Sequence, residues 1–209
     1  MKAILFDFDG TLIDSAPDHL RAYRASLAHY GIDLTPERYF ATYSPNWHQM
    51  YAALGLPQTA WEEADAAWLA EVANHESPLF PGVVPLLSNL GQRSTLGLVT
   101  AGSRSRVMQQ LKRTGIRDSF DVIITHEDVQ RRKPDPDGLL QALATLRITP
   151  DEAVYVGDAR EDCQMAQSAW VAFVGVAGDL ATIRLTDCPQ IATIADLPAF
   201  LVTQGWDRS

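Results

Sequence analysis

The chain of 209 residues is long enough for one α/β domain of ordinary size with a modest insertion, and two large domains would not fit. Its 46% hydrophobic and 21% charged residues are typical of globular proteins and exclude a disordered or fibrous chain. A formal net charge of -9 and a pI near 4.9 argue against nucleic acid or an anionic membrane as the main partner, because both repel an acidic surface.

The chain opens with a short apolar run, residues 2–6, which ends in the polar sequence Asp7-Phe-Asp-Gly-Thr11. A short continuous apolar run is typical of a strand that is buried on both faces of a parallel sheet. We therefore predict a first strand that is followed at once by a polar turn.

Residues 14–80 differ from the rest of the chain, because they contain no strand-like run and carry aromatic residues throughout. Ser15-Ala-Pro-Asp18 combines an N-cap serine, a proline in the first turn and an acidic residue, which predicts a helix that ends near Gly31. Thr59 opens a second predicted helix. We expect a small helical insertion here, whose two short crossings to the rest of the chain act as hinges.

After residue 80, apolar runs alternate with helical patterns. The runs expected to form strands cover 96–100, 122–125, 153–156, 171–174 and, more weakly, 190–194. Helical periodicity is seen over 103–114, 136–146 and 161–169. Strand alternating with helix predicts an α/β fold with a doubly wound, Rossmann-like parallel sheet. We therefore expect an α/β core of residues 1–13 and 81–209 and an inserted helical cap of residues 14–80.

Only two cysteines occur, Cys163 and Cys188, and they form no CxxC or other metal-binding spacing. We therefore predict two buried or incidental thiols rather than a disulfide framework or a zinc site. No apolar run approaches the ~18 residues that a membrane-spanning helix needs. Met1-Lys2 leads directly into the first predicted strand rather than into a signal peptide. We therefore expect a cytoplasmic protein with no membrane partner.

Charged and hydroxyl side chains follow the predicted strands, where ligands bind in open parallel sheets. Asp7 and Asp9 follow the first strand, and Thr100, Lys133 and Asp158 follow later ones. Several aspartates that converge on one place need a counter-charge, which a divalent cation and the lysine can supply. Because the available ligands are oxygens and no His/Cys cluster competes, magnesium is the expected ion.

The two aspartates of the first turn are expected to have different catalytic roles. Asp7 and Asp9 lie two residues apart in an extended segment, so both side chains can face one substrate. A carboxylate is ionised at neutral pH, so Asp7 can attack phosphorus and form an acyl phosphate that water hydrolyses. Asp9 then protonates the leaving alcohol and later takes a proton from the attacking water. Lys133 and magnesium offset the charge of the transferring phosphoryl group.

The expected phosphate-binding groups surround the end of the strand over 96–100. Thr100 supplies a hydroxyl donor, and the backbone amides of Phe8, Ala101 and Gly102 assist it. Thr11 is interpreted as a structural residue that supports the first turn through a hydrogen bond.

Four segments follow one another along the chain: Asp7-Phe-Asp-Gly-Thr11, Leu98-Val-Thr100, Lys133-Pro-Asp-Pro136 and Val156-Gly-Asp-Ala-Arg-Glu-Asp162. In sequence and order they resemble the motifs of the haloacid dehalogenase-like hydrolase superfamily, in the subgroup with a helical cap inserted after the first motif. Leu12-Ile-Asp-Ser-Ala-Pro-Asp18 is similar to a string found in the phosphoglycolate phosphatase branch.

The resemblance implies roles for four aspartates. Asp7 would be the nucleophile and a metal ligand, and Asp9 would bind the metal through its carbonyl besides moving protons. Asp158 would be a metal ligand, and Asp162 would give outer-shell support or hold a metal-bound water.

The chain departs from the family pattern at two places. Trp170 follows Ser168-Ala169, where a glycine is usual, and we interpret this indole as a packing or subunit contact. The segment 101–104 replaces an asparagine-rich stretch, which changes the amide donors of the phosphate pocket.

Substrate specificity is expected in the helical insertion. Arg21 and His48 are candidates for substrate contact, and the five histidines of the chain show no metal spacing. The aromatic residues of the insertion are interpreted first as the core of a small helical unit and second as the lining of a substrate enclosure.

The sequence thus predicts a magnesium-dependent phosphatase that hydrolyses a small phosphorylated metabolite, phosphoglycolate or a similar compound, through an aspartyl phosphate on Asp7. A sugar phosphomutase and a non-catalytic metabolite-binding regulator are the alternatives. A dehalogenase is disfavoured, because it needs neither a proton donor at Asp9 nor an acidic metal site at Asp158.

Overall fold

The computed structural model describes residues 1–73, 76–177 and 188–206. The chain forms two compact units. The core unit comprises Met1–Asp14 and Pro78–Ser209, and the helical unit comprises Ser15–Ser77. Both crossings between the units thus fall near the two ends of the segment that lacks strand-like runs.

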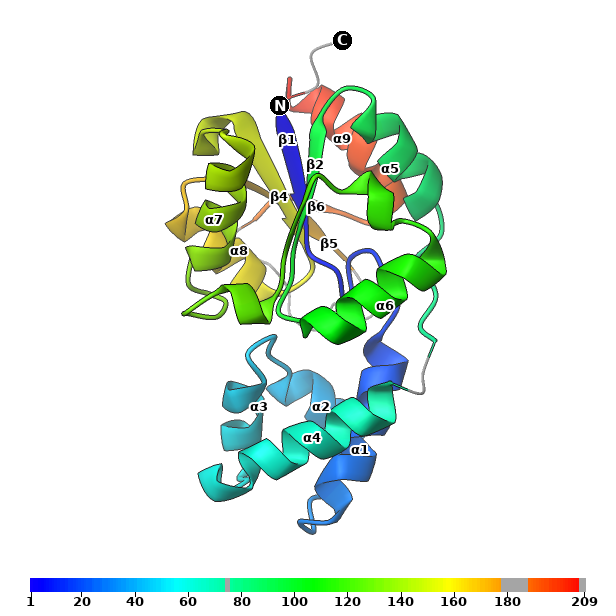
Figure 1. Cartoon of the computed structure of the whole chain (residues 1–209), viewed down its shortest axis with the longest axis vertical. Coiled ribbons are helices and arrows are strands. Elements are labelled where there is room, and N and C mark those ends of the chain that lie inside the picture. The colour runs from blue at the N-terminus through cyan, green and yellow to red at the C-terminus, as the bar shows by residue number, and fades with distance from the viewer. Residues whose placement is uncertain (74–75, 178–187, 207–209) are drawn as a thin grey trace. The chain divides into compact units, whose positions relative to one another are not determined.

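The core unit is built on a parallel sheet with the strand order β3-β2-β1-β4-β5-β6 (Figure 1). Its strands are β1 (Ala3–Phe6), β2 (Thr95–Val99), β3 (Val122–Ile124), β4 (Ala153–Gly157), β5 (Ala172–Val176) and β6 (Gln190–Ile191). Ala3 of β1 pairs with Thr95 on one side and with Ala153 on the other. The predicted doubly wound sheet is confirmed, and the first strand of the chain lies inside it.

Helices cover both faces of this sheet. They are α5 (Val83–Gly91), α6 (Arg104–Thr114), α7 (Asp137–Leu146), α8 (Arg160–Ser168) and α9 (Leu197–Thr203). Ile4 and Phe6 pack in the cluster that holds α5, α6 and α9, whereas Ala3 and Leu5 pack with α7 and α8. This alternation explains why β1 reads as a continuous apolar run, since both of its faces are buried. Within the described ranges, no helix is both long enough and apolar enough to cross a membrane.

The helical unit consists of α1 (Ala16–Ala28), α2 (Pro36–Thr42), α3 (Trp47–Leu54), a 3-10 turn η1 (Gln58–Ala60) and α4 (Trp61–Val72). Tyr23, Tyr39 and Tyr51 are buried, and the ring of Tyr23 lies 6.0 Å from that of Tyr39 and 6.2 Å from that of Tyr51. These tyrosines therefore form the core of the unit. Ser15 stands at the N-cap position of α1, but its side chain makes no capping hydrogen bond.

The interpretation of the two cysteines as buried or incidental thiols is wrong, because a disulfide joins Cys163 to Cys188. Cys163 lies on α8 and Cys188 just before β6, and their Cα atoms are 6.9 Å apart. The two cysteines are 25 residues apart in sequence. The packing of α8 against β5, the neighbour of β6, brings them together rather than a short spacing motif.

Trp170 occupies the left-handed region of backbone conformation, with φ 59°. It follows the end of α8, where its amide donates to the carbonyl of Gln167, and this position of a helix end commonly carries glycine. Its side chain is 87% exposed. The exposure is incompatible with a packing contact inside the described part of the core unit, so the subunit contact remains as the prediction for this indole.

Candidate active site at the carboxyl edge of the sheet

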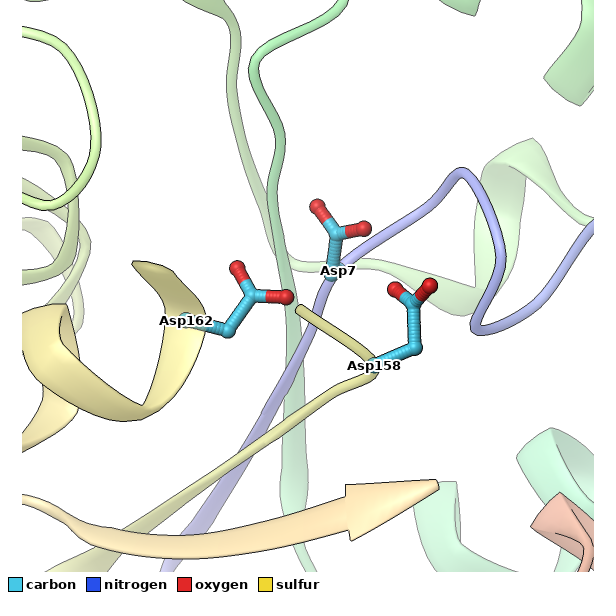
Figure 2. A group of neighbouring side chains, drawn as sticks. All are labelled: Asp7, Asp158 and Asp162. Atoms are coloured by element: carbon cyan, nitrogen blue, oxygen red, sulfur yellow. The ribbon is translucent and has the colours of Figure 1, made fainter. Parts of the chain in front are cut away.

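Three buried aspartates meet beyond the carboxyl ends of β1 and β4. Asp7 directly follows β1, and its amide donates to the carbonyl of Val156 at 2.8 Å, which fixes the position of its backbone beside β4. Asp158 follows β4, and Asp162 lies in the first turn of α8. One carboxylate oxygen of each lies within 4.8 Å of the others, and Figure 2 shows the three side chains together.

Lys133 connects this cluster. Its Nζ donates to Asp7 Oδ1 at 2.6 Å, to Asp162 Oδ1 at 2.8 Å and to the hydroxyl of Tyr155 at 2.7 Å. Tyr155 in turn donates to the carbonyl of Val99 at 2.8 Å. The lysine side chain is only 5% exposed, so its charge is directed into the protein. Sequence reasoning missed Tyr155, because a tyrosine within an apolar strand has the appearance of an ordinary core residue.

Burial and the neighbouring charges shift the pKa values of the groups in the cluster. Burial raises the pKa of Asp7 to about 7, although Lys133 opposes this effect. Burial, followed by the charges of Asp7 and Asp162, raises the pKa of Asp158 well above its usual range. Burial alone lowers the pKa of Lys133, but the carboxylates of Asp162 and Asp7 outweigh it and leave that pKa above its usual range. The site therefore carries more buried negative charge than one lysine offsets.

A cation would fit next to Asp158. Thr11 Oγ1 donates to Asp158 Oδ1 at 3.1 Å, whereas Asp158 Oδ2 is buried and has no hydrogen-bond partner among the described residues. A buried oxygen of a carboxylate is costly to leave without a partner. Gly10 lies against this oxygen, since a Cβ built at Gly10 would be 2.2 Å from Asp158 Oδ2. The oxygen-only ligands suit a hard divalent ion such as magnesium.

The metal-free protein is expected to be more stable at pH 5 than at pH 7.5, by about 2 kcal/mol. The pKa of Asp7 rises from 3.8 to about 7 on folding, so the folded state holds this proton more tightly. The resulting stability is fully present below pH 3.8 and is lost as the pH rises through about 7. Urea unfolding in EDTA at the two pH values measures the difference.

Magnesium should reverse this order, because it stabilises the ionised carboxylates more at pH 7.5 than at pH 5. Asp158→Asn removes one of the interacting carboxylates and should reduce the pH dependence in EDTA. Equal stability of the wild-type protein at both pH values in EDTA would contradict the expected uncompensated charge.

Asp9 lies apart from the three-aspartate cluster. Its carboxylate forms a bidentate ion pair with Arg106 of α6, with Nη1–Oδ1 and Nη2–Oδ2 distances of 2.9 Å and 2.5 Å. Sequence reasoning missed Arg106, because an arginine in the first turns of a helix is usually a solvated charge. No local pattern could have linked it to a residue 97 positions earlier.

The predicted phosphate loop follows β2. Thr100 is 5% exposed, and its amide donates to the carbonyl of Ile124 at 3.0 Å. The amide of Gly102 donates to Thr100 Oγ1 at 3.0 Å, so this amide orients the hydroxyl. Ala101 lies between them. Phe8 is buried between Asp7 and Asp9, and its carbonyl accepts from the amide of Leu12 in the first turn.

Both candidates for substrate contact in the helical unit have partners inside that unit. Arg21 donates to the carboxylate of Asp18, which also accepts from the hydroxyl of Ser77. His48 stacks on Trp61 with ring centroids 4.8 Å apart. Their role in substrate binding stays a prediction.

A family model for haloacid dehalogenase-like hydrolases matches residues 4–176. The chain belongs to this family. The resemblance drawn from the four sequence motifs is therefore confirmed, and the parallel sheet with its flanking helices is the fold of the family. As a haloacid dehalogenase-like hydrolase, the chain is an enzyme.

Proteins that are similar to this chain over most of its length narrow the assignment from the family to its phosphatases. A phosphoglycolate phosphatase of Yersinia pseudotuberculosis is 32% identical, over 94% of this chain and 91% of that protein. The pyrophosphatase PpaX of Bacillus pumilus is 32% identical, over 85% of this chain and 83% of that protein. The crystal structure of a phosphoglycolate phosphatase-like protein from Lactobacillus plantarum has a TM-score of 0.88 and 28% identity, over 95% of this chain and 98% of that one. These likenesses place this hydrolase among the phosphatases of the family.

Proposed function

We propose that the chain is a magnesium-dependent phosphatase that hydrolyses a small phosphate monoester through an aspartyl phosphate on Asp7. The observation that carries the proposal is the buried cluster of Asp7, Asp158 and Asp162 around Lys133 Nζ. A cluster of acidic groups with one cation is suited to a reaction that brings in a dianionic phosphate together with a divalent ion.

The first half-reaction moves the phosphoryl group to the enzyme. A carboxylate oxygen of Asp7 attacks phosphorus, and the bond from phosphorus to the leaving alcohol oxygen breaks. Asp9 supplies the proton that this oxygen takes up. In the second half-reaction a water attacks the phosphorus, Asp9 accepts its proton, and inorganic phosphate and the Asp7 carboxylate are released.

The magnesium ion would be held by carboxylate oxygens of Asp7 and Asp158 and by the carbonyl of Asp9. When bound, it offsets the negative charge of the transferring phosphoryl group. Asp158 Oδ2, which has no hydrogen-bond partner in the described part of the chain, supports this ligand set. Asp162 takes a supporting place, because Lys133 Nζ donates to its Oδ1 at 2.8 Å and the amide of Ala159 to its Oδ2 at 3.0 Å. Thr11 orients Asp158 through its hydroxyl.

The phosphoryl oxygens would be bound by Lys133, by the hydroxyl of Thr100 and by the backbone amides of Phe8 and Ala101. Gly102 would contribute through Thr100, since its amide donates to Thr100 Oγ1. An oxygen that accepts this bond still has its own hydrogen to donate to phosphate.

The core, residues 1–13 and 81–209, would carry the chemistry, and the cap, residues 14–80, would exclude water during phosphoryl transfer and select the substrate. The names of the relatives, a phosphoglycolate phosphatase and a pyrophosphatase, support a small phosphorylated substrate.

Phosphate release from a panel of small phosphate esters tests the proposal. We expect release in magnesium, at least ~10²-fold less in EDTA, and recovery when magnesium is restored, because the buried carboxylates repel the substrate without the ion. Acid-quenched enzyme should carry a phosphoryl group on Asp7 that hydroxylamine removes.

Three outcomes would contradict this function. Phosphate release that EDTA does not affect would exclude a requirement for a divalent metal. Isomerisation of a sugar phosphate without free phosphate would indicate a mutase, and tight metabolite binding without turnover in magnesium would indicate a regulator.

A further inference from the structure

A second buried ion pair lies beside the proposed catalytic cluster. Arg106 and Asp9 pair through the two terminal guanidinium nitrogens, Nη1 and Nη2, and both carboxylate oxygens, and their side chains are only 7% and 11% exposed. Such a fork fixes the plane of the carboxylate as well as its distance, which a single lysine contact does not do.

The surroundings of Arg106 hold it in this pose. Gln110, one helical turn later on α6, accepts from Arg106 Nη1 at 3.1 Å through its Oε1. Gly102 leaves room for the guanidinium, because a Cβ at this position would lie 2.4 Å from Arg106 Nη2. The arginine is therefore held between the predicted phosphate loop and its own helix.

We infer that Arg106 is a positioning residue that fixes the orientation of the Asp9 carboxylate for both proton transfers of the reaction. The inference rests on the proposed function. A carboxylate offers about four lone-pair sites, and the fork with Arg106 uses two of them, so the fork does not by itself prevent a proton transfer at Asp9. Without the fork, Asp9 could rotate about its side-chain bonds, and small errors in the position of a catalytic group can cost ~10²-fold in rate.

The leaving group separates this role from a general structural one. An alkyl phosphate needs a proton on its leaving oxygen, whereas p-nitrophenolate leaves without one. We expect Arg106→Gln to lower kcat for an alkyl phosphate such as 2-phosphoglycolate by about 30–100-fold and kcat for p-nitrophenyl phosphate less than about 5-fold, with KM nearly unchanged for both. Arg106→Lys keeps the charge but not the fork, and should fall between wild type and Arg106→Gln.

A double-mutant cycle identifies the group through which Arg106 acts. Asp9→Asn should show the same leaving-group dependence, and adding Arg106→Gln to it should cause little further loss, because residues that act as a unit are not additive. Lys112→Gln is the matched control, because Lys112 is an exposed, charged residue of the same helix and lies outside the predicted phosphate loop. Both esters should be hydrolysed normally by this control.

Each other outcome overturns the inference. Equal losses on the two esters would mean that Arg106 supports the fold or binds phosphate, and additive losses in the cycle would mean that it acts apart from Asp9. If Arg106→Gln does not fold, the losses in kcat for the two esters are compared in Arg106→Lys instead. A wild-type protein that releases phosphate from no ester of the panel in magnesium overturns the proposed function itself, a result distinct from any of these.

Discussion

The Asp7→Asn variant is expected to lose at least ~10⁴-fold in kcat for phosphate release while it stays folded. Asparagine has the size and shape of aspartate, but its amide is a poor nucleophile towards phosphorus. Because burial and the neighbouring carboxylates raise the pKa of Asp7 to about 7, an uncharged side chain there relieves repulsion. We therefore expect its urea midpoint in EDTA at pH 7.5 to equal or exceed that of the wild type.

Asp151→Asn is the control for this variant, because Asp151 is an exposed aspartate of the core unit that precedes β4. It should leave both kcat and the urea midpoint unchanged. Phosphate release by Asp7→Asn at a rate near that of the wild type would exclude Asp7 as the nucleophile, and a variant that fails to fold would instead show that the carboxylate is needed for the structure.

Lys133→Met is expected to lower the free energy of unfolding by about 3–5 kcal/mol and to abolish phosphate release. The lysine is 5% exposed and donates to Asp7 and Asp162, so its removal leaves two buried carboxylates without their shared cation. Methionine fills a similar volume, which limits the loss to electrostatics and hydrogen bonds. Urea unfolding at pH 7.5 and phosphate-release assays measure the two effects.

The cause can be isolated by removing the charge that the lysine balances. Lys133→Met combined with Asp7→Asn should recover part of the lost stability but none of the activity. Lys112→Met, an exposed lysine on α6, should change stability by less than about 0.5 kcal/mol. Full stability in Lys133→Met would show that Lys133 serves the substrate phosphate and not the integrity of the cluster.

Local patterns in the sequence predicted much of the fold. The apolar runs that form β1 and β4 are buried on both faces, so their composition alone marks them as inner strands. Helix α6 ends where Gly115 takes a left-handed conformation, which is the stop that the sequence indicated. The carboxyl ends of parallel strands lie at one edge of a sheet, so the sequence alone predicts that Asp7 and Asp158 lie together.

The parts that could not be predicted depend on contacts between distant residues. Tyr155 donates across the sheet to Val99, and Arg106 reaches Asp9 only because α6 packs near the first turn. The disulfide depends in the same way on the packing of α8 against β5, the strand that pairs with β6. Helices α5 and α9 were not predicted either. Their sequences are short and mostly apolar, so periodicity alone does not separate them from strands or loops.

The central place of β1 has a consequence for the synthesis of the protein. β1 is made before both of its neighbours in the sheet, because β2 begins at Thr95 and β4 begins at Ala153. At ~5–20 residues per second, this strand waits roughly 7–30 s for its second partner. During that time it exposes an apolar, unpaired edge, which is the kind of segment that chaperones bind and that aggregates when unprotected. The cluster of Asp7, Asp158 and Asp162 therefore assembles only after β4 has been made, and the yield of folded protein should depend on how quickly β4 joins the sheet.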